Sequence, residues 1–95
     1  MRVRWTTPAL RDIEKIGDDI ALDNPVASLR VVTRIFDQCD QLGTYPHMGR
    51  AGRVPGTREL VVSDTAFVVP YRVREDEVQV LAVLHGARRW PERFP

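Results

Sequence analysis

Residues 59–84 read ELVVSDTAFVVPYRVREDEVQVLAVL, and this stretch decides the fold. It contains three runs rich in Val, Leu, Phe and Tyr, at residues 59–62, 67–73 and 78–84. Polar turns at residues 63–65 and 75–76 separate these runs. Short apolar runs with turn residues between them are typical of consecutive antiparallel strands. We therefore predict a three-stranded antiparallel meander.

Pro70 interrupts the middle run of the meander. Proline has no amide hydrogen and cannot donate a hydrogen bond to a neighbouring strand. We therefore expect a bulge or a locally unpaired edge at this position.

Two amphipathic helices are predicted upstream of the meander. In the first, over residues 8–22, apolar side chains recur at spacings of three and four, at Leu10, Ile13, Ile16 and Ile20. Such spacing places them on one helical face. The second helix, over residues 25–42, starts with the capping sequence Asn24-Pro25 and carries its own apolar stripe. Only two or three residues link the helices, so they must form an antiparallel hairpin.

The remaining segments complete a β-α-α-β-β-β order. Residues 2–6 alternate like a short strand, and residues 45–57 hold two prolines and three glycines, which is typical of a loop. The helical hairpin must cover one face of a small, mainly antiparallel sheet, because each carries a single apolar side. We predict an α+β fold and one domain over residues 1–95, since this length leaves no room for a second core.

The composition excludes several classes of protein. No run approaches the roughly 20 apolar residues that span a bilayer, and the basic first residues lack the apolar centre of a signal peptide. We therefore expect a cytoplasmic protein without a membrane partner. The single cysteine, Cys39, allows neither an intrachain disulfide nor a zinc cluster of thiolates. Because no glycine-rich phosphate-binding motif is present, we expect no nucleotide cofactor. We also expect no other cofactor and no metal.

Arginines gather in the second half of the chain. Thirteen arginines stand against one lysine, and residues 43–95 carry a net charge of +2 whereas residues 1–42 carry −1. Residues 47–58 hold three arginines and no acid, and residues 85–93 hold three arginines and one acid. Arginine forks bind phosphate bidentately, so these clusters predict a phosphate-facing surface. A GC-rich genome is the alternative explanation for the excess of arginine.

Residues spread over nearly the whole chain follow one characteristic order. They are Trp5, Ala9, Ile13, Asn24-Pro25, Pro46, Gly49-Arg50, Pro55-Gly56-Thr57-Arg58-Glu59-Leu60, Tyr71-Arg72-Val73 and His85-Gly86-Ala87-Arg88-Arg89-Trp90-Pro91. In this order the sequence resembles the RelE/ParE superfamily of toxins from bacterial type II toxin–antitoxin modules. The resemblance implies a growth-inhibiting toxin that is kept silent by a cognate antitoxin encoded beside it.

The resemblance leaves three functions open. RelE-like members enter the ribosomal A site and cut messenger RNA without a metal, whereas ParE-like members poison DNA gyrase. An inactive relative would only bind its antitoxin. The first of these, a ribosome-dependent endonuclease that acts on messenger RNA, is the primary expectation from the sequence, with the ribosome as partner.

Metal-free RNA cleavage needs a base for the 2′-hydroxyl, a cation for the phosphate and an acid for the leaving oxygen. For these tasks we predict Arg58, His85 and Arg88 as catalytic residues. In RelE-like members an arginine that Arg88 matches contributes to cleavage. The prediction requires the guanidinium groups of Arg58 and Arg88 to approach one phosphate. Further contacts to RNA phosphate would come from Arg50, Arg53 and Arg89.

Each catalytic candidate also has a purely structural alternative. Arg58 can form a salt bridge with Glu59 or with an acid on a helix, and Arg88 can form one with Glu92. His85 follows a strongly apolar run, so it can be a half-buried histidine that is hydrogen-bonded to backbone at a strand end.

Some positions depart from the nuclease pattern. Val68 stands where RelE-like nucleases usually carry an arginine, and Phe94 stands where several have a terminal tyrosine. The common lysine pair of the preceding strand is absent. The ending HGARRWP, at residues 85–91, also differs from the tail of well-marked gyrase poisons.

Overall fold

The computed structural model describes all 95 residues as two helices and six strands. In chain order the elements are β1 (Arg2–Trp5), α1 (Thr7–Ala21), α2 (Pro25–Asp40), the 3-10 turn η1 (Gln41–Gly43), β2 (Arg50–Ala51), β3 (Arg58–Val61), β4 (Phe67–Arg74), β5 (Glu77–Val80) and β6 (Leu84–His85). Neither helix is long and apolar enough to cross a membrane.

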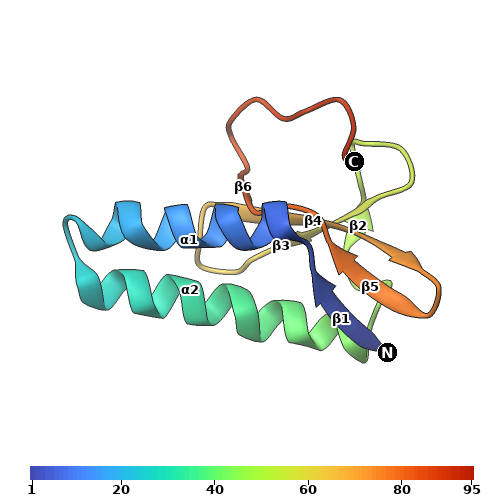
Figure 1. The fold of residues 1–95 in the computed structure, drawn as a ribbon, viewed down its shortest axis with the longest axis horizontal. Coiled ribbons are helices and arrows are strands. Elements are labelled where there is room, and N and C mark those ends of the chain that lie inside the picture. Colours follow the sequence, from blue (N-terminus) through green and yellow to red (C-terminus); the bar gives the residue numbers. More distant parts are fainter.

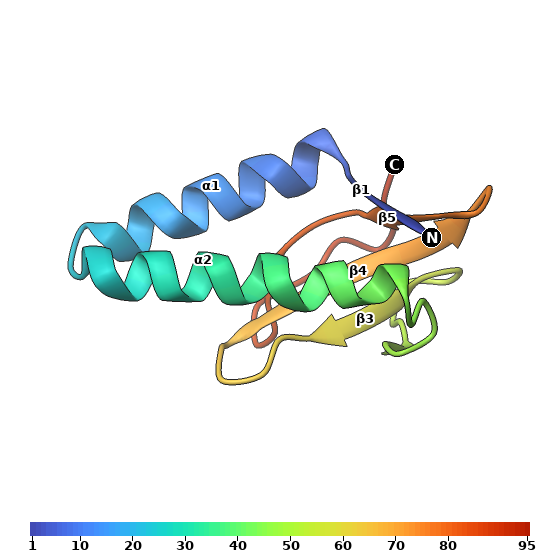
Figure 2. The ribbon, with the colours of Figure 1, turned by 90° about the horizontal axis from the view of Figure 1, so that it is seen from below.

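One sheet forms the second layer of the molecule. Its strand order is β1-β5-β4-β3-β2, and β6 also pairs with β4. The pairing of β1 with β5 is parallel and all other pairings are antiparallel. The antiparallel hairpin of α1 and α2 covers one face of this sheet (Figures 1 and 2). The predicted α+β architecture is therefore confirmed.

Helix α2 begins at the residue that the sequence predicts, and α1 begins one residue before its predicted start. The side chains of Thr6 and Asn24 accept hydrogen bonds from backbone N–H groups in the first turns of α1 and α2, which satisfies donors that a helix start leaves unpaired. The two helices pack closely at Gly17, where a Cβ atom would lie 3.1 Å from the side chain of Val32. Helix α2 ends at Asp40, two residues before its predicted end, because the chain tightens there into the 3-10 turn.

The core lies between the hairpin and the sheet. Ile13 and Ile35 from the helices meet Val69, Tyr71 and Val80 from β4 and β5. At one border of the core, the rings of Trp5 and Phe36 lie 4.7 Å apart between centroids. Apolar side chains of both layers are thus removed from water together, which is the main driving force of the fold.

The run at residues 78–84 is not the single strand that the sequence predicts. The register pairs Tyr71 with Val80 but Val68 with Leu84, so two residues of β4 face three residues between β5 and β6. One residue too many on one strand is a β-bulge. Pro70 lies opposite it, and its carbonyl accepts a hydrogen bond from the Leu81 N–H at 2.9 Å. The prediction of a bulge at Pro70 is confirmed.

A carboxylate from α1 pairs with the bulge. The Val83 N–H, which has left the regular ladder, donates to Oδ2 of Asp12 at 3.0 Å. Burial raises the pKa of Asp12, and the hydrogen bond from Val83 partly opposes that rise. The interaction fixes α1 against the point where β5 ends and β6 begins.

We predict that Asp12→Ala destabilises the fold. Val83 is buried, so its N–H would lose its only partner, and an unpaired buried donor costs about 1–3 kcal/mol. Urea unfolding should show a loss in this range for Asp12→Ala and a smaller loss for Asp12→Asn, which keeps an acceptor oxygen. Glu14→Ala, an exposed change on the same helix, serves as control. Equal stability of Asp12→Ala and Glu14→Ala would contradict the prediction.

Candidate functional site

The loop before β3 and the C-terminal residues meet on the sheet face that points away from the helices. Side chains alternate between the two faces of a strand. Leu60 and Tyr71 belong to the core, so Glu59 and Arg72 point to the opposite face. The chain after β6 arches out and back (Figure 1), and its Trp90 contacts Arg53 of the loop that precedes β3.

Glu59 is the centre of this outer face. Only 2% of its surface is exposed, and Arg50 and Arg53 neutralise it. The Arg53 N–H and Nε donate to Oε2 at 2.8 and 3.1 Å, and Arg50 Nη2 donates to Oε1 at 3.0 Å. Burial alone would raise the pKa of Glu59, but these hydrogen bonds outweigh it and hold the pKa below its usual value. Glu59 is therefore an ionised structural carboxylate.

Arg53 also anchors the C-terminal tail, which we define as residues 86–95. Its guanidinium carbon lies 3.6 Å from the centre of the Trp90 ring, a cation–π contact. Trp90 Nε1 donates to the carbonyl of His85 at 3.2 Å, and Arg72 Nη2 donates to the carbonyl of Pro95 at 2.8 Å. The tail is thus attached to the sheet at its middle and at its end.

Tyr71 holds the start of the loop. Its hydroxyl donates to the Pro46 carbonyl at 2.8 Å and accepts from the Gly49 N–H at 2.9 Å. A Cβ atom at Gly49 would lie 2.7 Å from the Tyr71 ring, so this close approach requires glycine. Burial raises the pKa of Tyr71. The buried hydroxyl is therefore neutral and acts as a structural clamp.

Arg58 lies on the other face of β3, next to this clamp. Its Nη1 donates to the carbonyls of Gly49 and His47 at 2.9 and 3.4 Å. The predicted alternative, a salt bridge with Glu59, does not form, because Glu59 points to the opposite face and binds two other arginines.

His85, Arg88 and Arg89 line a groove of about 390 Å³ between α1 and the tail. Nδ1 of His85 accepts the Ala87 N–H at 3.2 Å, and its ring meets the Phe67 ring edge-on at a centroid distance of 5.9 Å. His85 is therefore a half-buried histidine bonded to backbone at a strand end, which is the structural alternative given for it above. Arg88 and Arg89 form no ion pair, so the predicted pair of Arg88 with Glu92 is not present.

The six predicted site residues form three separate groups. His85, Arg88 and Arg89 share the groove, Arg50 and Arg53 share Glu59, and Arg58 stands apart from both groups. Arg58 pairs with Tyr71 on β4 whereas His85 pairs with Phe67. Four residues of strand separate these points by roughly 13 Å. Arg58 is bound to loop carbonyls and does not line the groove that Arg88 lines, and the approach of both side chains to one phosphate stays a prediction.

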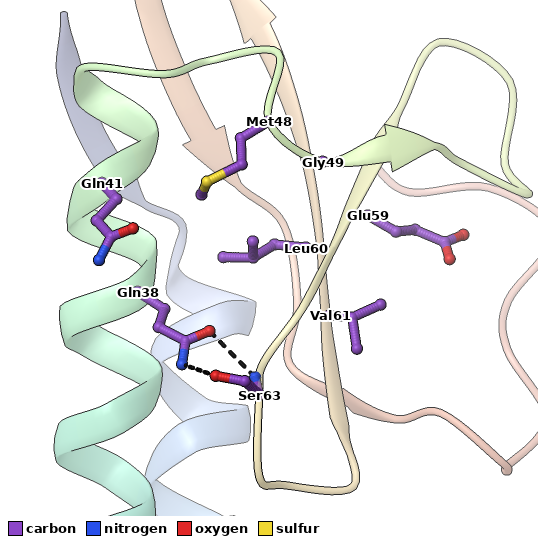
Figure 3. Close-up of a pocket in the computed structure, with 8 residues that line it drawn as sticks. All are labelled: Gln38, Gln41, Met48, Gly49, Glu59, Leu60, Val61 and Ser63. Carbon is purple, nitrogen blue, oxygen red and sulfur yellow. Dashed lines mark hydrogen bonds between the residues drawn. The ribbon is translucent and has the colours of Figure 1, made fainter.

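A second pocket, of about 450 Å³, lies between α2 and β3. Figure 3 shows Leu60 and Met48 pointing into it, while Glu59 and Val61 leave β3 on the other side. Gln38 closes one end, because its amide binds Ser63 through Nε2–Oγ at 2.6 Å and through Oε1 with the Ser63 N–H at 3.1 Å (Figure 3). No cation lines this pocket, so it does not suit a phosphate.

Two further chemistries find no support in the side chains. Cys39 is buried in the core, and burial together with the charge of Asp40 raises its pKa to about 12, so the thiol is not a nucleophile at neutral pH. No group of three or more His, Cys, Asp or Glu side chains is placed to hold a metal ion.

Sequence reasoning missed the central role of Glu59 and Trp90. A signal for Glu59 exists, because it precedes a core leucine in the strand and follows two arginines of the loop at positions 50 and 53. Trp90 carries no such signal, since its partner Arg53 is distant in the sequence and only folding brings them together.

Comparison with known proteins gives consistent matches over most of the chain. Residues 3–90 match the family described as "ParE toxin of type II toxin-antitoxin system, parDE". The chain is 46% identical to "Putative toxin Y4kP" of Sinorhizobium fredii over 91 residues, which cover 96% of this chain and 94% of that protein. It is 36% identical to "Toxin RelE2" of Caulobacter vibrioides over 87 residues, which cover 92% and 97%.

A solved structure has the same fold. It is titled "Chromosomal ParDE TA system from P. aeruginosa", and the match has a TM-score of 0.80 at 31% sequence identity. The match covers 87% of this chain and 92% of that chain.

We predict that Glu59 makes stability depend on pH. Because folding lowers its pKa, its contribution is present above the unfolded pKa of 4.5 and is lost as the pH falls through the folded value. Urea unfolding of the wild type should therefore show stability falling from about pH 6 to about pH 3. Glu59→Gln should be about 1–3 kcal/mol less stable at neutral pH.

The variant should also lose part of this pH dependence. The remainder belongs in part to Glu77, whose pKa is lowered chiefly by a hydrogen bond from Arg4. Glu14→Gln is the matched control on α1. Parallel curves of stability against pH for the wild type and Glu59→Gln would show that this carboxylate does not have the role described.

Proposed function

The chain belongs to the ParE/RelE family of toxins from type II toxin–antitoxin systems, and we propose that it inhibits growth by binding DNA gyrase. In this proposal the toxin acts by contact and carries out no reaction of its own. A cognate antitoxin keeps it silent, and both toxin and target are in the cytoplasm.

The observation that carries the proposal is how the arginines are used. In-line cleavage of RNA requires its catalytic groups to be within about 3 Å of the reacting atoms around one phosphate. Arg58 is instead bound to two loop carbonyls, and it pairs with Tyr71, four residues along β4 from the partner of His85. Arg50 and Arg53 are bound to Glu59. These arginines stabilise the surface and are not free to stabilise a transition state.

The hydrogen bond of His85 also argues against a nuclease. Because Nδ1 accepts a hydrogen bond from the Ala87 N–H, the proton of the neutral ring is on Nε2. In this arrangement neither ring nitrogen is free to accept a proton from a 2′-hydroxyl. His85 is therefore poorly placed as a general base.

The tail offers a surface suited to macromolecular contact. Arg88, Arg89 and Arg93 are exposed, and Trp90 of the same segment contacts Arg53. Arginine and tryptophan are enriched among the residues that dominate binding energy at protein interfaces. The family name ParE and the ParDE title of the P. aeruginosa structure support gyrase as the target.

Messenger RNA cleavage on the ribosome is the second candidate. The C. vibrioides relative is named RelE2, and His85, Arg88 and Arg89 do line one groove. In this alternative Arg88 would stabilise the phosphate and Arg89 would bind the RNA backbone, beside His85 in the same groove.

We predict that the purified toxin increases the amount of cleaved DNA trapped with gyrase. The assay measures linear plasmid after denaturation of gyrase–DNA complexes, while RNA ends are mapped in cells after controlled expression. Trapped DNA should rise with toxin concentration, and transcripts should remain whole. The double change Arg88→Ala and Arg89→Ala should reduce potency about tenfold or more, because interface arginines often cost more than 1 kcal/mol when truncated.

Arg11→Ala is the control, because Arg11 is an exposed arginine on α1 outside the groove. Cuts inside codons of ribosome-bound transcripts, with gyrase unaffected, would contradict the proposal and favour the nuclease. Normal growth during expression of the free toxin would contradict both and leave a relative that only binds antitoxin.

A further inference from the structure

Four arginines of β1 and β4 lie on the outer face of the sheet, on the side of β5. Val3 and Val73 pack against the core, and side chains alternate between the two faces of a strand. Their neighbours along the two strands therefore point to the outer face. These neighbours are Arg2, Arg4, Arg72 and Arg74, which we call the arginine quartet. None of them is among the six predicted site residues.

The strand register aligns the quartet in two rows across β5. The rows run from Arg2 through Glu77 to Arg74, and from Arg4 through Gln79 to Arg72. The two arginines of a row are separated by two strand spacings, about 10 Å, and the rows are two residues apart along the strands, about 7 Å. The quartet is therefore a regular array of cations and not a chance cluster of loop residues.

One carboxylate is shared by this array. Oε1 of Glu77 accepts a hydrogen bond from Arg4 Nε at 2.9 Å, and Oε2 lies 4.0 Å from Arg2 Nε. Arg72 and Arg74 form no ion pair with an acidic side chain. The side chain of Arg2 is 75% exposed, and Arg74 is exposed as well. Most of the positive charge of the quartet is thus available to a ligand.

The charges of the whole molecule are divided between its two layers. The outer face, with the loop before β3, the β4–β5 turn and the tail, carries nine arginines and five acidic residues. Residues 7–40, which form the helical hairpin, carry four basic and seven acidic residues. The net charge of +1 therefore results from a positive outer layer and a negative helical layer. Such a division turns the outer face toward a polyanion during their encounter.

The shape of this surface favours duplex DNA over a single strand. Single strands usually stack their bases on aromatic faces, but the Trp90 ring already has the Arg53 guanidinium over it. The path from β1 to β2 crosses five strands, which gives a width of about 19 Å. Over that length of its axis, a duplex presents about eleven phosphate charges.

We propose that the outer face binds the phosphate backbone of duplex DNA without reading its bases. Each guanidinium can bind a phosphate through two parallel hydrogen bonds. A sheet face of this width does not enter a major groove that is about 12 Å wide, so its contacts are with the backbone. The inference goes beyond the proposed function, because here the toxin binds DNA by itself, without gyrase.

The test measures the fluorescence anisotropy of a short labelled DNA duplex with purified toxin and no gyrase. Kd should be about 1–100 µM at physiological salt, and log Kd should rise against log salt concentration with a slope of about 3.6, as expected for four phosphate contacts. Arg2→Gln combined with Arg74→Gln should halve this slope and raise Kd at least about tenfold at about 0.1 M salt. Arg2→Lys combined with Arg74→Lys keeps both charges and should stay within about threefold of the wild type.

A matched double variant controls for net charge. Arg11 and Arg30 are exposed arginines of the helical hairpin and form no ion pair. Arg11→Gln combined with Arg30→Gln should leave Kd within about twofold, because exposed charges more than about 10 Å apart are largely screened at 0.1 M salt. Urea unfolding checks that each variant is folded.

Three results would overturn the inference. The first is a wild type that does not bind the duplex, and the second is equal weakening by the quartet variant and the control. The third is tighter binding of a single-stranded RNA of the same length that also depends on the quartet, because this result would assign the surface to RNA.

The binding assay contains no gyrase, so the two proposals can fail separately. Binding of the duplex by a toxin that traps no DNA with gyrase would contradict only the proposed function. Trapped DNA without binding of the free duplex would contradict only the inference.

Discussion

The missing amide hydrogen of Pro70 is the constraint on which the rest of this structure depends. It sits in β4, the strand that pairs with β3, β5 and β6, at the point where a continuous ladder cannot be completed. The segment that joins β5 to β6 therefore forms a bulge, and β6 pairs with β4 in a register shifted by one residue from that of β5. That departure releases the Val83 N–H to Asp12 and directs the following residues past α1. The bulge opposite this proline therefore sets the course of the residues that line the groove beside α1.

Buried charge explains why a chain rich in arginine need not be a nuclease. Burial of the Glu59 carboxylate without a nearby cation would destabilise the fold. Arg50 and Arg53 form ion pairs with it and offset this cost. Arg53 then has its other side against Trp90, which links the loop to the tail. On the tail, Arg88, Arg89 and Arg93 are exposed and form no ion pair. The difference between structural and available cations, more than their number, decides what the surface can bind.

Local patterns in the sequence predicted most elements but few partners. Helical periodicity, the cap at Asn24 and the position of Pro70 each act over a few residues, so they could be predicted correctly. The parallel pairing of β1 with β5 joins residues more than 70 positions apart, and no local pattern encodes it. For the same reason the sequence shows where the arginines lie in the chain but not which partner each one has. Folding alone decides which arginines bind Glu59, which one binds the Gly49 carbonyl and which line the groove beside α1.

The pairing of β1 with β5 also governs when this protein can exist as a folded molecule. The strand that is synthesised first finds its place beside one that is synthesised almost last, and Arg4 reinforces the match by binding Glu77 at 2.9 Å. Closing so large a loop costs chain entropy before any contact is gained. Until β5 is made, the sheet lacks the strand that joins β1 to β4. The complete sheet can therefore form only after both ends of the chain have been made.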